Sequence, residues 1–123
     1  MAKKVLVVDD SRTALMMERE ILEKGTPYHC VTASDGQEAV EKAKLERPDL
    51  ILMDVVMPRM NGFEACKMMR QQQGTRDIPI VLVTTRGEEE YMEAGFQSGC
   101  NDYITKPVNG EELVALLQSY LGE

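Results

Sequence analysis

The sequence has 123 residues, of which 43% are hydrophobic, and this length suits one compact domain with a core of ordinary size. Because the chain has 2 Phe and no Trp, that core must be mainly aliphatic. The formal net charge of −7 excludes a surface built to bind nucleic acid phosphates, which requires clusters of Lys and Arg.

Apolar runs rich in β-branched residues alternate with helical patterns from one end of the chain to the other. The first half of the chain predicts a strand over 5–8 that stops at Asp9, a helix over 11–24, a weaker strand over 28–32 and a helix that begins after Asp35 and ends before Pro48. A strand over 50–53 that stops at Asp54 and a helix from Asn61 to about Arg70 follow. The last part predicts a strand over 78–83, a short acidic helix over 88–97, a strand over 102–104 and a helix that begins after Asn109. Both Asp35 and Asn109 are followed three residues later by Glu, which is typical of a capping box at a helix start.

Five such strand–helix units with continuous apolar strands predict a parallel sheet that helices cover on both faces. The sequence shows no linker, internal repeat or low-complexity tract. We therefore expect an α/β fold and a single domain over residues 1–123. The paired methionines on the predicted helices are expected to fill core or groove space; they are Met16, Met17, Met68 and Met69.

Polar residues follow four of the five predicted strands at the point where each strand ends. They are Asp9, Asp10, Asp54, Thr84 and Lys106. In an open parallel sheet the carboxyl ends of the strands share one edge, and ligands bind at that edge. We therefore expect these five side chains to meet in one cleft.

Three carboxylates, a hydroxyl and an ammonium are the parts of a site for a phosphoryl group and a cation. Clustered carboxylates repel one another, which raises their pKa values unless a cation neutralises them. Mg²⁺ suits such a site because it is held by one or two carboxylates, waters and phosphate oxygens. A carboxylate can also act as a nucleophile and form an aspartyl-phosphate. The cation and the Lys ammonium would then offset charge on the transferring group.

Four segments of the sequence resemble the signature blocks of two-component receiver domains. These segments are Val-Val-Asp-Asp-Ser at 7–11, Asp-Val-Val-Met-Pro-Arg-Met-Asn-Gly at 54–62, Val-Thr-Thr at 83–85 and Asp-Tyr-Ile-Thr-Lys-Pro at 102–107. The resemblance covers essentially all 123 residues, with the blocks in the right order and spacing. It implies a flavodoxin-like, doubly wound sheet of five parallel strands in the order 2-1-3-4-5, with five helices.

The resemblance also implies a role for each residue of the site. Asp54 would be the phosphoacceptor, and Lys106 would pair with the acyl phosphate. Asp10 would be a direct ligand of Mg²⁺, and Asp9 would act beside it through water. Asp54 itself and the backbone carbonyl of Val56 would complete the protein's share of the metal shell.

The resemblance further implies how phosphorylation is transmitted. Thr84 would move toward the phosphoryl group, and Tyr103 would turn inward as the space that Thr84 leaves opens. The peptide bond between Lys106 and Pro107 would be cis. The output would be a changed surface formed by the fourth helix (88–97), the fifth strand and the last helix.

Three departures from the usual receiver pattern bear on the lifetime of the phosphorylated state. Thr85 stands where many relatives have Ala, Gly or Ser, and its bulk would narrow solvent access to the acyl phosphate. Arg86 would reach over the site. Val56 has no polar side chain to orient an attacking water. We hypothesise a phosphorylated state of moderate to long lifetime.

The partners that the resemblance implies are a sensor histidine kinase or phosphotransfer protein, which donates the phosphoryl group, and a separate downstream target. No effector region follows in the sequence, so the expected output is docking, with chemotaxis or motility control plausible. We expect a monomer, with dimerisation through the output surface possible. No direct contact with nucleic acid and no membrane insertion are expected.

Three alternative functions fit the residues less well. A phosphorylation-independent interaction domain would keep the fold but would not need all five site residues. An aspartate-nucleophile phosphatase would need Asp-x-Asp after the first strand and a cap domain, whereas Asp9 and Asp10 are adjacent. A nucleotide binder would need a phosphate loop that is rich in Gly or in Ser and Thr at that position. We therefore expect a signalling domain with only self-catalysed phosphoryl transfer and hydrolysis, and not an enzyme.

The expected compartment is the cytoplasm. No apolar run approaches the roughly 20 residues that span a bilayer. The start, Met-Ala-Lys-Lys, leads directly into a strand pattern without the apolar region of a signal peptide. Cys30, Cys66 and Cys100 are widely spaced and form no metal-ligand pattern, so we expect reduced, packed thiols.

Overall fold

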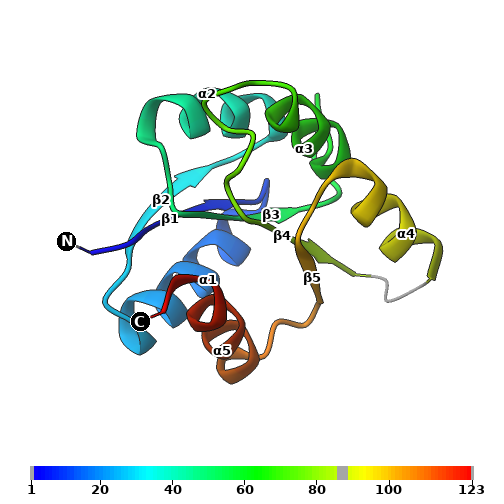
Figure 1. Cartoon of the computed structure of the whole chain (residues 1–123). Helices are drawn as coiled ribbons and strands as arrows, with labels where there is room; N and C mark the ends of the chain where they lie inside the picture. Colours follow the sequence, from blue (N-terminus) through cyan, green and yellow to red (C-terminus); the bar gives the residue numbers. More distant parts are fainter. Residues whose placement is uncertain (1, 86–88, 123) are drawn as a thin grey trace.

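The computed structural model describes the backbone of residues 2–85 and 89–122, together with the side chains of all of these except 89–91. Strands and helices alternate along the chain (Figure 1). In order they are β1 (Lys4–Val8), α1 (Arg12–Gly25), β2 (His29–Ala33), α2 (Gly36–Glu46), β3 (Leu50–Asp54), α3 (Gly62–Arg70), β4 (Ile80–Thr84), α4 (Glu89–Ser98), β5 (Asp102–Thr105) and α5 (Gly110–Leu121).

The five strands form one parallel sheet in the order β2-β1-β3-β4-β5. Helices α2, α3 and α4 lie on one face of the sheet, and α1 and α5 lie on the other (Figure 1). This is the flavodoxin-like, doubly wound fold that the resemblance implied. All five strands run the same way, so their carboxyl ends lie at a common edge, and the loops at that edge can form one site.

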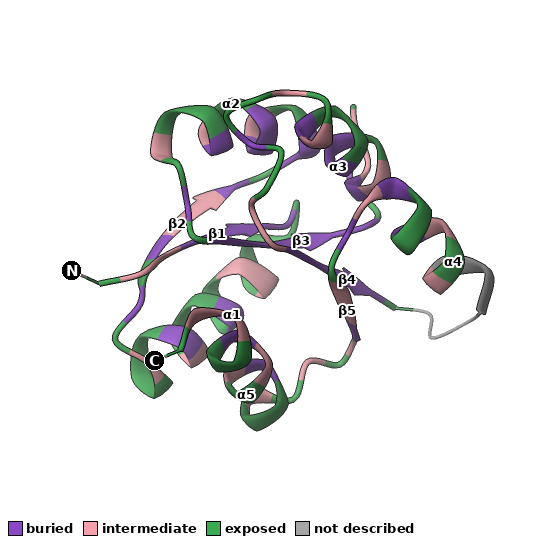
Figure 2. Ribbon diagram, viewed as in Figure 1, coloured by how far each residue is buried: buried purple, intermediate pink, exposed green. Residues whose placement is uncertain are grey.

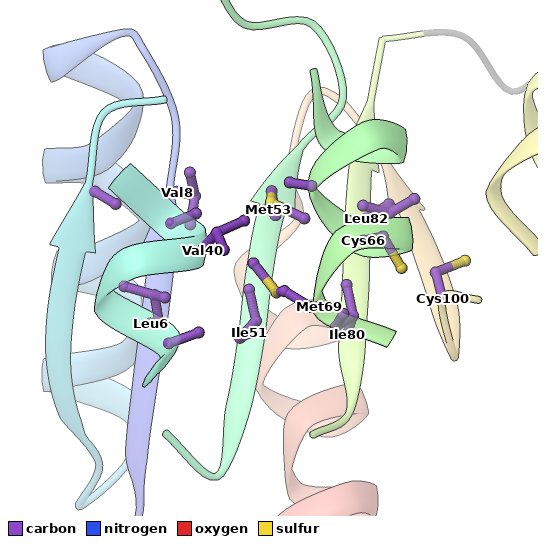
Figure 3. Packing of buried hydrophobic residues seen from close by; sticks show 14 of the residues in the cluster. Leu6, Val8, Val40, Ile51, Met53, Cys66, Met69, Ile80, Leu82 and Cys100 are labelled. Carbon is purple, nitrogen blue, oxygen red and sulfur yellow. The ribbon is translucent and has the colours of Figure 1, made fainter. Parts of the chain in front are cut away.

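Two aliphatic cores lie on the two faces of the sheet, because successive strand side chains point to opposite sides. Leu6 and Val8 belong to the core beneath α2 and α3, whereas Val5 and Val7 belong to the core beneath α1 and α5. Figure 3 shows Ile51 of β3 packing in the first of these cores. The central strands β1, β3 and β4 are buried along nearly all of their length, whereas the edge strands β2 and β5 are partly exposed (Figure 2). Buried central strands therefore lead into Asp9 and end at Asp54 and Thr84.

Local chemistry explains where the helices begin. Asn61 accepts a hydrogen bond from the backbone N–H of Glu64 at 2.9 Å, and the Glu64 carboxylate accepts one from the N–H of Asn61 at 3.0 Å. Asp35 caps α2 through the N–H of Glu38, as predicted. The predicted capping box there is shifted by one residue, because the Glu38 carboxylate accepts from the N–H of Ser34 at 2.6 Å.

Two other predictions needed correction. The fourth strand begins at Ile80 and not at residue 78, because Pro79 has no N–H with which to pair along the sheet. Of the methionine pairs, Met69 fills the core as predicted, but Met16, Met17 and Met68 are 71%, 59% and 38% exposed. Met16 and Met17 lie on the outer part of α1, since the helix buries Glu18 and Leu22 instead.

The remaining sequence predictions on thiols and membranes can be compared with the described residues. All three cysteines are buried and free, as predicted. Burial raises the pKa of the Cys66 thiol and raises the pKa of the Cys100 thiol to about 11, so both stay protonated at neutral pH. None of the helices in the described part of the chain combines the length and apolar character needed to traverse a bilayer.

Candidate functional site

The polar residues that follow the strands converge at the carboxyl edge of the sheet. Asp9 follows β1, Asp54 ends β3, and Lys106 follows β5. The Lys106 ammonium donates a hydrogen bond to Asp9 Oδ2 at 3.0 Å and lies 3.5 Å from Asp54 Oδ2. Segments 97 residues apart in the sequence therefore meet as the parallel sheet predicted.

Thr84 belongs to the same edge through its backbone. It is the last residue of β4, and its carbonyl oxygen accepts a hydrogen bond from the N–H of Lys106 at 2.7 Å. The side chain of Thr84 is buried. The peptide bond between Lys106 and Pro107 is cis, as the resemblance implied. The β4–β5 pairing therefore determines where the base of the Lys106 side chain lies.

Three carboxylates form a candidate cation site. Asp9, Asp10 and Asp54 each offer an oxygen, and these oxygens lie within 4.8 Å of one another. Asp10 is exposed, whereas Asp9 and Asp54 are buried. Hard oxygen ligands that converge from one side, and leave the other side open to water, are what Mg²⁺ prefers. The donor set therefore fits that ion.

Asp9 already has two partners of its own. One carboxylate oxygen accepts a hydrogen bond from the N–H of Ser11 at 2.9 Å, and the other accepts one from Lys106. Asp10 presents its carboxylate to solvent. Asp9 is therefore already engaged by neighbouring donors, whereas Asp10 is exposed; that Asp10 contacts a cation directly and Asp9 acts beside it stays a prediction.

The electrostatics of the site are unbalanced. Burial and the nearby charge of Asp9 raise the pKa of Asp54 to about 6, and the Lys106 ammonium only partly opposes them. Burial by itself would lower the pKa of Lys106, but the hydrogen bond to Asp9 and the charges of Asp54, Asp9 and Glu18 raise it instead. The ammonium therefore stays charged, and the carboxylates exceed the positive charge beside them. A divalent cation would restore the balance.

Glu18 is a residue of this region that the sequence reasoning missed. It lies on α1 with only 3% of its surface exposed. Burial, together with the charges of Asp9 and Asp54, raises its pKa to about 7. Glu18 follows Ala14 by four residues, so it shares the apolar face of the predicted helix. A charged residue at such a position was the signal that could have revealed it.

The predicted switch residues are close to a narrow cavity beneath α4. Its lining includes Thr84, Tyr103 and Phe63. The ring of Tyr103 is half-buried and meets the ring of Phe96 edge to face, with centroids 6.1 Å apart and planes at 83°. Arg86, which was expected to reach over the site, lies outside the described residues, as does Glu88 at the expected start of α4.

The sequence matches a family described as response regulator receiver domain, over residues 5–118. Protein PilH of Pseudomonas aeruginosa is 37% identical over 118 residues, which are 96% of this chain and 97% of PilH. The alkaline phosphatase synthesis transcriptional regulatory protein PhoP of Bacillus subtilis is 41% identical over 121 residues, which are 98% of this chain and 49% of PhoP. The chain therefore spans nearly all of PilH but about half the length of the transcriptional regulators that it matches.

Solved structures resemble the whole chain. Chemotaxis protein CheY4 of Vibrio cholerae superposes with a TM-score of 0.91 at 38% identity, and the match covers 98% of this chain and 99% of CheY4. The receiver domain of sensor histidine kinase PA1611 from Pseudomonas aeruginosa superposes with a TM-score of 0.90 at 31% identity, covering 100% of both chains. That receiver domain was crystallised with a magnesium ion coordinated in its active site cleft.

Proposed function

The chain belongs to the response regulator receiver domain family, and from that premise we propose that it accepts a phosphoryl group on Asp54 and thereby changes a binding surface. Receiver domains are signalling domains of two-component systems and not conventional enzymes. The observation that carries the proposal is the position of the Asp54 carboxylate, which lies within 3.5 Å of an ammonium and beside two further carboxylates.

Residues of this chain would hold Mg²⁺ through the carboxylates of Asp10 and Asp54 and the backbone carbonyl of Val56, with Asp9 beside them. The ion would supply positive charge to the phosphoryl oxygens during transfer. Three converging carboxylate oxygens support this assignment, because they otherwise repel one another. The magnesium ion in the receiver domain of PA1611 is a property of that protein and adds support by likeness.

The proposed reaction begins on a phosphohistidine of the donor, which is a histidine kinase or a phosphotransfer protein. A carboxylate oxygen of Asp54 forms a bond to phosphorus as the phosphorus–nitrogen bond to the donor breaks, and the nitrogen keeps the electron pair. Lys106 then pairs with an oxygen of the new acyl phosphate, which draws it from Asp54 and Asp9. The Asp54 carboxylate, partly protonated below about pH 6, acts as a nucleophile only when it is ionised.

The proposed output is a shift between two conformations. The Thr84 hydroxyl moves toward the phosphoryl group, and Tyr103 turns into the cavity that both residues line. This changes the surface formed by α4, β5 and α5, where Phe96 is 51% exposed. A separate target protein would read that surface. CheY4 carries the name of a chemotaxis protein, and this likeness is why we propose chemotaxis or motility as the pathway in which this chain acts.

The expectations on assembly extend this proposal. We infer one receiver domain over residues 1–123 that acts in the cytoplasm as a monomer, or as a dimer through the α4-β5-α5 surface. Val56 and Thr85 both have exposed side chains, and neither offers a carboxamide or carboxylate to orient an attacking water. This supports a phosphorylated state of moderate to long lifetime, measurable as the decay of Asp54 phosphate in the purified protein.

The test is phosphorylation with acetyl phosphate. We expect intact-protein mass spectrometry to show the addition of one phosphoryl group in the presence of Mg²⁺, and none after chelation with EDTA. Asp54→Asn is expected to abolish the addition, whereas Asp49→Asn, an exposed Asp distant from the site, should leave it unchanged. A wild-type chain that stays unmodified by acetyl phosphate and by phosphorylated donor proteins would favour the alternative, a phosphorylation-independent interaction domain.

A further inference from the structure

Two loops beside the site are joined by an ion pair between Asp35 and Arg59. Asp35 lies in the β2–α2 loop (34–35), and Arg59 lies in the β3–α3 loop (55–61). The Arg59 guanidinium donates to Asp35 Oδ2, and the Asp35 side chain is only 3% exposed. Its other oxygen accepts from the N–H of Glu38 at 2.8 Å. One carboxylate therefore caps α2 and also holds the neighbouring loop.

The same two loops are also in close backbone contact. A Cβ atom at Gly36 would overlap the carbonyl oxygen of Met60, so only glycine permits this approach. A Cβ atom at Gly62 would likewise overlap the carbonyl oxygen of Asp54. The N–H of Gly62 donates to Val55 O at 2.8 Å, which closes the base of the β3–α3 loop. The loop is therefore held at its base against Asp54 and at its tip against α2.

The tip of this loop has an unusual backbone conformation. Arg59 has φ of 65°, the left-handed region that residues other than glycine adopt only when their surroundings hold them there. Its ion pair with Asp35 is such a hold. Val56 stands between Asp54 and Arg59 in the chain, so the orientation of its carbonyl depends on both ends of the loop.

We propose that the Asp35–Arg59 ion pair is a positioning device for the β3–α3 loop, which sets the affinity of the site for a divalent cation. The pair would hold the Val56 carbonyl beside the oxygens of Asp10 and Asp54, without touching the cation or the phosphoryl group itself. This inference rests on the proposed function, because it concerns the same cation site.

Simple electrostatics gives the opposite expectation for one of the two partners. Arg59 is a positive charge near the site, so its removal should strengthen cation binding if only the charge matters. If the ion pair positions the loop, removal of Arg59 should instead weaken cation binding. The sign of the effect of Arg59→Gln therefore separates positioning from long-range charge.

Asp35→Asn provides the complementary change. Asn caps helices as well as Asp does, so α2 keeps its cap while the ion pair is lost. The control is Glu46→Gln at the other end of α2. This change removes the ion pair between Glu46 and Lys4, whose atoms are 3.0 Å apart, at the opposite edge of the sheet.

The experiment is calorimetric titration of the metal-free protein with Mg²⁺ alone. We expect Asp35→Asn and Arg59→Gln each to raise the Mg²⁺ dissociation constant by about threefold to tenfold. This is at or below the smallest losses that are usual when a residue that orients a metal ligand, without touching the metal, is removed. The double variant should bind Mg²⁺ no more weakly than the weaker-binding single variant, because both changes break the same ion pair. Glu46→Gln should match the wild type.

Two further measurements distinguish positioning from general destabilisation. In the metal-free variants, hydrogen exchange at the amides of Met60 and Gly62 should be faster, whereas the amides of β1 and β3 should exchange as in the wild type. At saturating Mg²⁺, phosphorylation by acetyl phosphate should return to the wild-type rate.

Two results would overturn the inference. The first is an unchanged or tighter Mg²⁺ affinity in Arg59→Gln while the wild type binds Mg²⁺; this leaves the proposed function intact. The second is a wild type that neither binds Mg²⁺ nor becomes phosphorylated, and this result would overturn the proposed function together with the inference.

Discussion

The two edges of the sheet satisfy their charges in different ways. At the amino edge the Arg70 guanidinium donates to the carbonyl oxygens of Gly99 (2.8 Å), Arg76 (3.0 Å) and Ile78 (2.9 Å). It also donates to Asn101 Oδ1 at 2.8 Å. At the carboxyl edge the Lys106 ammonium faces Asp9 and Asp54 with other carboxylates close by. One cation is surrounded by neutral acceptors, and the other is outnumbered by negative charge.

This difference separates a structural role from a functional one. Arg70 joins α3, the segment before β4 and the segment before β5, and nothing else is needed to complete its hydrogen bonds. The carboxyl edge keeps an excess of negative charge until a cation or another positive group binds there, and this excess favours the binding of such a group. Four predictions test the contrast, from the largest expected effect to the smallest.

Arg70→Ala should be the most damaging change at the amino edge. It removes four hydrogen bonds at 3.0 Å or less and leaves partly buried carbonyl oxygens without their donor. We expect a loss of about 3 kcal/mol in the free energy of unfolding, measured by urea denaturation. Lys67→Ala, at an exposed position on the same helix, is the control and should change little. A loss below about 1 kcal/mol would contradict the structural role of Arg70.

Glu18→Leu should stabilise the metal-free protein at the carboxyl edge. The folded-state pKa of Glu18 is raised from 4.5 to about 7, so the wild type loses stability as the pH rises from 4.5 through 7. Above pH 7 we expect the variant to be more stable by roughly 2 kcal/mol, with the difference falling toward acidic pH. Denaturation at pH 5 and pH 8 measures it. An equal difference at both values would show that Glu18 does not titrate in this range.

Asp54→Asn should also stabilise the metal-free protein, by a smaller amount. The pKa of Asp54 is raised from 3.8 to about 6, so its ionisation destabilises the fold as the pH rises through 6. The gain is limited because the Lys106 ammonium, 3.5 Å away, already opposes this rise by stabilising the ionised carboxylate. We expect roughly 1.5 kcal/mol at pH 8 and little difference near pH 4. A destabilised Asp54→Asn variant at pH 8 would mean that the Lys106 pair outweighs the repulsion.

Mg²⁺ should complete the carboxyl edge and leave the amino edge unaffected. At ten times its dissociation constant, an ion that binds only the folded state stabilises it by about 1.4 kcal/mol. We expect this increase in the wild type and in Lys67→Ala, and a smaller one in Asp10→Asn. The midpoint of thermal unfolding with and without Mg²⁺ measures the effect. No increase in the wild type would show that the carboxylates do not bind the ion.

The sequence predicted the carboxyl edge better than the amino edge for a physical reason. Apolar runs mark where strands end, and a parallel sheet brings those ends together, so Asp9, Asp54 and Lys106 could be assigned to one site. The partners of Arg70 are mainly backbone carbonyls, which carry no residue signature. Its position at the end of a predicted helix gave no reason to expect hydrogen bonds to the four acceptors before β4 and β5.

The same distinction applies to the residues around the site. Glu18 and Arg59 are charged residues in a helix and a loop, where a solvent-exposed side chain is the usual outcome. The ion pair of Arg59 depends on how close two loops approach, which hydrophobic periodicity does not show. The burial of Glu18 could be suspected from its position on the apolar face of the predicted helix, but the charges beside it depend on how α1 packs. The exposure of Met16 and Met17 has the same origin, because a helix pattern with apolar residues on several sides does not determine which side faces the sheet.

The hydrogen bond from the N–H of Lys106 to Thr84 O, at 2.7 Å, has a consequence for engineering. It makes the backbone of Lys106 an extension of strand pairing, so exposed residues on the outer faces of α4 and α5 can be changed without altering the hydrogen bond that places the base of this side chain. A library randomised at exposed positions of those two helices could be selected for binding to new partner proteins, while every member keeps the same residues at the carboxyl edge of the sheet.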